Sequence, residues 1–187
     1  AIAIRERLTR ENPTVTEFQS SLAASHNNLG ALLAERNKLP EALAAHEAAK
    51  EIRERLAREK PDVSEFQSEL AKTHANLGRL LLATGKSTEA LSAYEAAKEI
   101  QERLVEEQPE LSEFQSDLAR SYNHLGRLLL ATGKTSEALA AHQAEATIFE
   151  RLARNNPTNT EYQSNLARSN GNLGVLLTQT GKPTEAL

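Results

Sequence analysis

Five histidines are the side chains of this chain that are best suited to acid–base or metal chemistry, since cysteine is absent. His26 and His74 stand 48 residues apart, and His46 and His142 alternate with Tyr94 at the same interval. A catalytic base needs a third group to orient it, and zinc needs several ligands at short spacing. Positions that exchange histidine with tyrosine are instead typical of half-polar packing. We therefore expect no enzyme, no metal and no cofactor.

Asparagine recurs around a repeated Leu-Gly pair. It fills two adjacent positions of the repeat, which are Asn28, Asn76, His124 and Asn172 in one case and Asn27 and Asn123 in the other. Because an amide side chain carries donors and an acceptor, a row of them on one helix could bind the backbone of an extended peptide. The same amides could equally hydrogen-bond between neighbouring repeats. Both interpretations stay open at this point.

Basic residues form a second set of candidate ligand contacts. They are Lys72, Arg79, Arg120, Arg127 and Arg168. Seven-residue steps place Lys72 with Arg79, and Arg120 with Arg127, on one helix face. The chain has a formal net charge of −4, so a basic strip within it favours an acidic or carboxylate-bearing ligand and not nucleic acid. The competing interpretation is that these are ordinary exposed cations, some of them paired three residues away along the helix.

The elements that position these side chains are repeated with a strict period of 48 residues. The period is marked by prolines and glycines, at Pro13, Pro61, Pro109 and Pro157 and at Gly30, Gly78, Gly126 and Gly174. A fixed period of this length indicates one supersecondary unit stacked on copies of itself. Alanine, leucine, glutamate, arginine and lysine dominate the composition, which favours helices.

Residues 61–108 show how one repeat is built. Ser64 and Gln67 predict a capping box at the start of a first helix of about 20 residues, here called helix A. The same pattern recurs as Thr16 with Gln19, Ser112 with Gln115 and Thr160 with Gln163. Gly85, like Gly133, Gly181 and the equivalent Asn37, predicts a left-handed residue just after that helix. A second helix, helix B, must end before Pro109.

The repeat resembles the tetratricopeptide repeat. The third copy reads Tyr122-x2-Leu125-Gly126-x2-Leu129 and then Ala138-x3-His142, where the family has aromatic-x2-Leu-Gly-x2-Tyr and Ala-x3-Phe. A repeat of about 34 residues is usual, so about 14 residues are added here. This length is similar to the elongated subtype found in kinesin light chains and in bacterial arrays attached to signalling proteins. The resemblance implies a scaffold that binds peptides or proteins along a concave face lined by helices A.

We therefore predict an all-α protein, a right-handed α-solenoid of stacked antiparallel helical hairpins. The chain is expected to be a single solenoid fragment over 1–187, made of a partial helix B (1–12), three repeats (13–60, 61–108 and 109–156) and an incomplete repeat (157–187). No apolar run approaches the roughly 20 residues that cross a bilayer, so we expect a cytoplasmic protein without a membrane partner.

The leading functional hypothesis is a non-enzymatic scaffold that binds an extended, acidic or carboxylate-bearing peptide through the asparagines and basic residues named above. The alternative is a structural spacer or a module that self-associates through exposed terminal repeats within a larger signalling protein. Unlike residues in equivalent groove positions, such as Ala75, Asn123 and Gly171, favour binding. Just over half of the positions are identical between residues 64–111 and 112–159, which favours a spacer.

Overall fold

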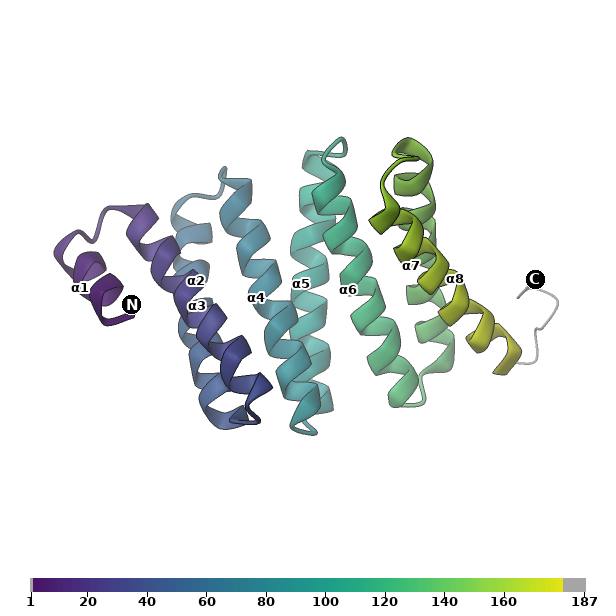
Figure 1. Ribbon diagram of the computed structural model, residues 1–187, viewed down its shortest axis with the longest axis horizontal. Coiled ribbons are helices and arrows are strands. Elements are labelled where there is room, and N and C mark those ends of the chain that lie inside the picture. Colours follow the sequence, from purple (N-terminus) through teal and green to yellow (C-terminus); the bar gives the residue numbers. More distant parts are fainter. Residues whose placement is uncertain (1, 180–187) are drawn as a thin grey trace. The chain divides into compact units, whose positions relative to one another are not determined.

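The computed structural model describes residues 2–179, which form helices joined by short turns (Figure 1). The helices in this range are α1 (Ile2–Glu11), α2 (Thr16–Glu35), α3 (Leu39–Glu59), α4 (Ser64–Ala83), α5 (Ser87–Glu107), α6 (Ser112–Ala131), α7 (Thr135–Asn155) and α8 (Thr160–Gln179). Within residues 2–179 there is no strand, so the all-α prediction is confirmed. Helices A are α2, α4, α6 and α8, and helices B are α3, α5 and α7, with α1 as a partial helix B.

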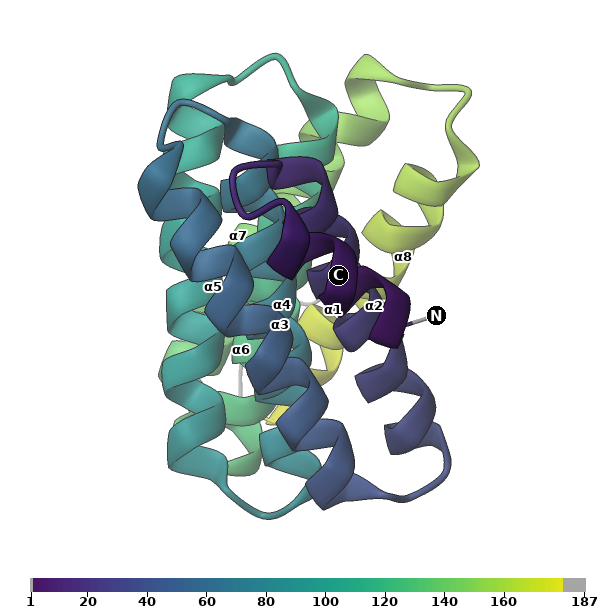
Figure 2. The same cartoon turned by 90° about the vertical axis from the view of Figure 1, so that its left-hand side faces the viewer.

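The chain divides into two compact units, residues 1–100 and 101–187, and the division falls within α5. In the first unit α1 packs against α2, α2 against α3, and α3 against α4. Figure 2 views this unit from α1, with α2 and α3 antiparallel behind it. In the second unit α6 packs against α7, and α7 against α8. Each unit is therefore built from the antiparallel hairpins that the repeat predicts.

The ends of helices A follow the prediction. Asn37, Gly85 and Gly133 have φ angles of 57°, 80° and 79°, the left-handed region that favours glycine or asparagine. After α4, the N–H of Lys86 donates to the Leu81 carbonyl and the N–H of Gly85 to the Leu82 carbonyl. This pair of bonds is a Schellman motif. Gly181, the fourth predicted residue of this kind, lies outside the described residues.

The predicted capping boxes are wrong for the first three copies. Helices α2, α4 and α6 begin at the predicted hydroxyl residue itself, and the cap position before it holds Val15, Val63 or Leu111, without a side-chain cap bond. The glutamine of the pattern has another partner. In three copies its amide donates to the carbonyl of the proline six residues earlier, from Gln19 to Pro13 and from Gln163 to Pro157 over 2.6 Å and also from Gln115 to Pro109. In the second copy Gln67 donates instead to the Ala57 carbonyl over 3.0 Å.

The physical reason lies in the turn that follows each proline. There the backbone itself supplies the early bonds, as when the Phe18 N–H donates to the Val15 carbonyl over 3.2 Å. The hydroxyl is thus displaced by one residue into the helix. In the fourth copy, where Asn159 replaces the apolar residue, its Oδ1 accepts from the N–H groups of Glu161 and Tyr162, at 3.0 and 3.3 Å.

Helices A and B approach each other most closely at the repeated glycine. The rings of His46, Tyr94 and His142 are almost fully buried, and they lie against Gly30, Gly78 and Gly126 respectively. A methyl group at any of these glycines would come within 2.6 to 2.8 Å of the facing ring, which no ordinary packing tolerates. The glycine of the Leu-Gly pair is therefore a packing requirement, and it fixes which ring faces helix A.

Candidate peptide-binding surface

In the first unit three of the predicted contacts lie in a line along α4. Lys72, Asn76 and Arg79 follow each other at steps of four and three residues, which places them on one side of a helix. Lys72 pairs with Glu69 on the same helix, with Nζ 3.5 Å from the carboxylate. Arg79 is exposed and forms no salt bridge within residues 2–179. We call this line the helix-A strip of the first unit, and the equivalent line on α6 the helix-A strip of the second unit.

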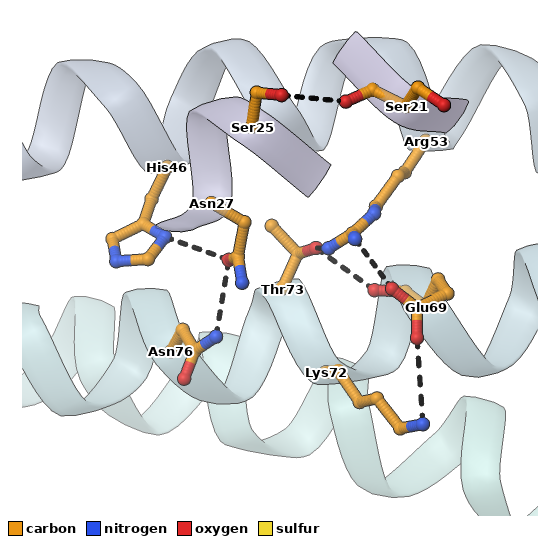
Figure 3. A network of polar contacts seen from close by, with 9 residues as sticks. All are labelled: Ser21, Ser25, Asn27, His46, Arg53, Glu69, Lys72, Thr73 and Asn76. Atoms are coloured by element: carbon orange, nitrogen blue, oxygen red, sulfur yellow. Dashed lines mark hydrogen bonds and ion pairs between the residues drawn. The ribbon is translucent and has the colours of Figure 1, made fainter. Parts of the chain in front are cut away.

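Two of the predicted asparagines of this unit, Asn27 and Asn76, are engaged inside the fold (Figure 3). Asn27 Oδ1 on α2 accepts from Asn76 Nδ2 on α4 over 3.1 Å and lies 3.0 Å from His46 Nδ1 on α3. This is the hydrogen bonding between neighbouring repeats that the sequence left open. Asn76 keeps its own Oδ1 without a bond within the described residues, while Asn28 is exposed and makes no side-chain hydrogen bond there.

The sequence analysis missed a buried cation, Arg53, that contacts α4 next to the strip residue Lys72. Arg53 of α3 is 5% exposed and donates to Thr73 Oγ1 and to the Glu69 carboxylate of α4. Figure 3 shows Glu69 between Arg53 and Lys72. Burial lowers the pKa of Arg53, and the Glu69 carboxylate opposes that shift. Glu69 is thus held by two cations, so Lys72 is already partly neutralised for any ligand.

In the second unit the strip runs along α6. Arg120 donates to Asp117 on the same helix over 3.2 Å and to Glu161 on α8 over 3.0 Å. His124 is half-buried, and Arg127 is exposed without a salt bridge in the described part of the chain. The strip of each unit therefore ends in one arginine, Arg79 or Arg127, that pairs with no carboxylate among residues 2–179.

Asn123 on α6 contributes to a buried polar cluster with α7. Its Nδ2 donates to both carboxylate oxygens of Glu145, at 3.0 and 2.9 Å, and His142 Nδ1 lies 3.0 Å from Glu145 Oε2. Glu145 is completely buried. Burial would raise the pKa of Glu145, but the hydrogen bonds from His142 and Asn123 outweigh it and lower that pKa below its ordinary value.

Sequence comparison between copies could have found this cluster. The equivalents of Glu145 are Ala49 and Ala97, so a carboxylate stands where the other copies have a buried methyl group. In the first copy the missing carboxylate lets Asn27 bond the histidine directly. The pair of amide and histidine thus occurs in the first and third copies, whereas the second has Ala75 and Tyr94. In the third copy Glu145 bridges the two side chains.

The remaining predicted contacts lie on α8. Arg168 donates to Asn165 over 3.0 Å on the exposed surface. Asn172 is half-buried and makes no side-chain hydrogen bond within residues 2–179. The position of α8 equivalent to Arg79 and Arg127 holds Val175, which is exposed. The helix-A strip thus loses its terminal cation in this copy.

The histidine positions fit packing. His74 is half-buried, and burial lowers its pKa. In the third copy the equivalent residue is Tyr122, whose hydroxyl donates to Glu102 over 2.7 Å. Burial and this carboxylate raise the pKa of Tyr122 to about 12. No group of three or more His, Asp or Glu side chains able to hold a metal ion occurs among the residues that the structure describes.

The family model described as tetratricopeptide repeat matches residues 22–57, 70–110 and 118–152, which is more than half of the chain. The chain belongs to the tetratricopeptide repeat family. Each matched segment covers one A–B hairpin of the fold. Members of this family generally mediate protein–protein interactions and are typically scaffolds without catalytic activity. None of the helices within residues 2–179 is long and apolar enough to span a membrane.

Solved structures support the same fold. A candidate kinesin light chain from Podosopora anserina with nearly identical TPR-like repeats is 22% identical, with a TM-score of 0.64, and the match covers 90% of this tetratricopeptide chain and 71% of that one. BtubC (BKLC) from P. vanneervenii is 17% identical with a TM-score of 0.55, covering 100% and 82% of the two chains. A search of curated protein sequences found no match. Helices of 20 or 21 residues in every complete hairpin agree with the elongated subtype.

Proposed function

We propose that this tetratricopeptide array holds an extended peptide that is acidic or ends in a carboxylate. Each unit binds peptide along its own helix-A strip, the side that the family resemblance implies for ligands. The observation that carries the proposal is the state of the basic residues. Lys72 and Arg120 pair with carboxylates, and Arg168 on α8 donates to Asn165. Arg79 and Arg127 are exposed and form no salt bridge within the described residues.

Arginine suits this role because its planar guanidinium binds a carboxylate through two parallel hydrogen bonds. Beside each arginine the strip offers a further polar group, Asn76 Oδ1 in the first unit and His124 in the second. Asn76 can therefore accept one backbone N–H of a peptide while its Nδ2 stays bonded to Asn27. Asn27 and Asn123 then act by fixing the packing of helices A and B, and not as direct ligand contacts.

The test is the affinity of a fluorescein-labelled hexaglutamate peptide with a free C-terminus, measured by fluorescence anisotropy. Substituting Arg79→Ala together with Arg127→Ala should weaken binding by roughly 2–4 kcal/mol, since each charge-assisted bond contributes about 1.5–3 kcal/mol before solvent screening. Affinity should also fall with added salt, because exposed charges are screened. The uncharged hexaglutamine peptide should bind much more weakly.

A matched control comes from helices B. Arg58 and Arg154 occupy equivalent positions of α3 and α7, and both are exposed. Replacing both with alanine removes the same net charge from the chain as the strip variant does. If the two double variants lose the same affinity, the loss reflects the net charge of the chain and not contacts made by Arg79 and Arg127. If the affinity changes neither with salt nor in the Arg79→Ala, Arg127→Ala variant, the proposed site is wrong.

The spacer alternative rests on the near-duplication of residues 64–111 in residues 112–159, because a ligand is not periodic whereas a spacer tolerates identical copies. If the array self-associates, light scattering over a dilution series should show an average molecular mass that decreases as the protein is diluted. A mass that stays at that of the monomer counts against self-association.

A further inference from the structure

A groove of about 370 Å³ lies between the helices B of the first unit. Its lining comes from α3, α4 and α5, and every residue that lines it lies within residues 1–100. On α4 it includes His74, which follows the strip residue Lys72 by two positions, or about 200° around the helix. The groove and the helix-A strip of this unit therefore lie on opposite sides of α4. We call this hollow the helix-B groove.

The lining of the helix-B groove is mainly apolar. It is formed by Leu43 of α3, Leu77 and Leu81 of α4, and Ala93 and Ala96 of α5. An apolar surface that is open to water is stabilised when a nonpolar group covers it. The groove is larger than the cavity of about 150 Å³ that holds a benzene ring, so an aromatic side chain fits into it.

His74 offers hydrogen bonds to a group in this groove. It is half-buried and forms no hydrogen bond within residues 2–179. Neither of its ring nitrogens is among the fully buried atoms that lack a partner, so both keep contact with solvent. Burial and the charge of Lys50 lower the pKa of His74. The neutral ring therefore presents one accessible donor and one accessible acceptor.

The third copy shows which side chain suits this position. Its equivalent residue is Tyr122, whose hydroxyl donates to Glu102 over 2.7 Å. The first unit has the equivalent carboxylate, Glu54. Its charge opposes the lowering of the His74 pKa, but no hydrogen bond joins the two side chains within the described residues. Because an imidazole is shorter than a phenol, His74 leaves room beside it for a phenol brought by a ligand.

Carboxylates outnumber cations around the groove. Glu47 and Glu89 are exposed residues of its lining, and an adjoining hollow along α3 adds Glu51 and Glu54. Lys50 is the only cation that lines either hollow within residues 2–179, and its Nζ lies 3.5 Å from Glu54 and 3.9 Å from Glu47. The negative charge around the groove therefore favours a cationic partner.

Two competitors for these carboxylates are weak. Lys86 Nζ lies 3.5 Å from Glu89, but both side chains are about half exposed, and such pairs contribute little to stability. Glu89 therefore stays available to a ligand cation. A second copy of this chain is also disfavoured as the occupant, because the chain has a net charge of −4 and is repelled by an acidic groove.

We propose that the helix-B groove binds a tyrosine side chain of a partner protein, in a segment where arginine or lysine flanks the tyrosine. The ring packs against the leucines and alanines, its hydroxyl hydrogen-bonds with His74, and the flanking cations pair with Glu47 and Glu89. This site goes beyond the proposed function and does not rest on it, since it lies on the other side of α4 and selects the opposite charge. A scaffold with both sites can bring an acidic and a basic segment together.

The probe for this site is the peptide acetyl-Arg-Arg-Tyr-Arg-Arg-amide, added to the intact ¹⁵N-labelled chain. The backbone amide signals of Ala93 and Ala96 in ¹H–¹⁵N NMR spectra report its affinity. The ring nitrogens of His74 are identified by the loss of their signals in His74→Tyr. Because one ring anchors the peptide, we expect a Kd on the order of 0.1 mM.

The tyrosine peptide should shift the ring signals of His74 and leave those of His142 unchanged. A peptide with phenylalanine in place of tyrosine should bind about fivefold more weakly, because it loses one hydrogen bond. A peptide with alanine there should show no measurable binding, and added salt should weaken binding of the tyrosine peptide. Unchanged His74 signals, or equal binding of the alanine peptide, would overturn the proposal.

Variants of the chain test the groove itself. His74→Tyr copies the third repeat, so it should keep the melting curve of the wild type while its own phenol fills the groove, and affinity should fall by about tenfold or more. Glu47→Gln with Glu89→Gln removes two charges at the groove and should weaken binding about fivefold. Its matched control is Glu17→Gln with Glu65→Gln, which removes the same charge from exposed positions of α2 and α4 and should weaken binding less than about twofold.

Equal losses in these two double variants, or unchanged affinity in His74→Tyr, would mean that the peptide binds elsewhere, and the proposed groove would be wrong. The Arg79→Ala, Arg127→Ala variant, which tests the helix-A strips, should keep its affinity for the tyrosine peptide; a loss there would contradict a separate site. If the signals of Ala93 and Ala96 change when the chain alone is diluted, a second copy occupies the groove and the proposal fails.

Discussion

The close contact between Gly78 and Tyr94 gives a prediction whose magnitude follows from the structure. A methyl group added at Gly78 would lie 2.6 Å from Tyr94 Cε1 and 2.7 Å from Cδ1, whereas carbon atoms pack at about 3.5–4.0 Å. The ring is 1% exposed, so it cannot move into solvent. One of the two helices must therefore shift by roughly 1 Å, and overpacking of this kind costs about 1–3 kcal/mol.

Alanine also stabilises a helix relative to glycine, by about 1 kcal/mol. Gly78→Ala should therefore lower the free energy of unfolding by about 0–2 kcal/mol. Gly171 in α8 provides the matched control, since it lies inside a helix and a methyl group there would meet no atom within 4 Å. Gly171→Ala should raise the free energy of unfolding by about 0.5–1 kcal/mol.

Because the gain in helix propensity is common to both variants, their difference isolates the contact. We expect Gly78→Ala to be about 1–3 kcal/mol less stable than Gly171→Ala. Urea unfolding followed by circular dichroism measures both, and shifts in midpoint at constant slope report stability. If the two variants are equally stable, the glycine is not required by the facing ring and the packing argument is wrong.

Three further predictions follow from single positions. Burial lowers the pKa of His46 below its ordinary value of 6.5, so the folded chain resists a proton that the unfolded chain accepts; stability should fall as pH drops below 6.5, and less steeply in His46→Tyr, measured by urea unfolding from pH 7 to 5. Arg53→Gln, which copies Gln101 of the next repeat, should lower the free energy of unfolding by about 1–3 kcal/mol, because it breaks a charged hydrogen bond to a largely buried partner; an unchanged melting curve would contradict this. Gly85→Ala should cost about 1–2 kcal/mol through its φ of 80° alone, and Gly85→Asn should melt closer to the wild type, since Asn is the residue that tolerates this conformation best after glycine.

The sequence determined those features that depend on one repeat at a time. The period of 48 residues fixed the number of hairpins. Asn37, Gly85 and Gly133 fixed the ends of α2, α4 and α6, because few residues adopt a positive φ without strain. Proline fixed the ends of helices B, because it pushes the residue before it out of the helical region. The all-helical fold and the repeat family could therefore be predicted from the sequence alone, and both are confirmed.

Helix starts were less predictable. The capping-box pattern was present in all four copies, yet the turn after each proline moved the hydroxyl one residue into the helix. The same local pattern is compatible with two backbone paths. The glutamine takes different partners in copies that share one path, Pro13 for Gln19 and Ala57 for Gln67. Sequence spacing does not contain that choice.

Only the tertiary structure decided how the polar side chains are used. Asn27 and Asn76 are 49 residues apart and meet because two helices A pack side by side. His46 is left with one unused nitrogen because that contact occupies the other. Helical periodicity tells which side of a helix a residue faces, but hydrogen bonding depends on distances of about 3 Å between atoms of different repeats. Those distances are set by the packing of glycine against a ring, so the fold could be read from the sequence and the candidate binding site could not.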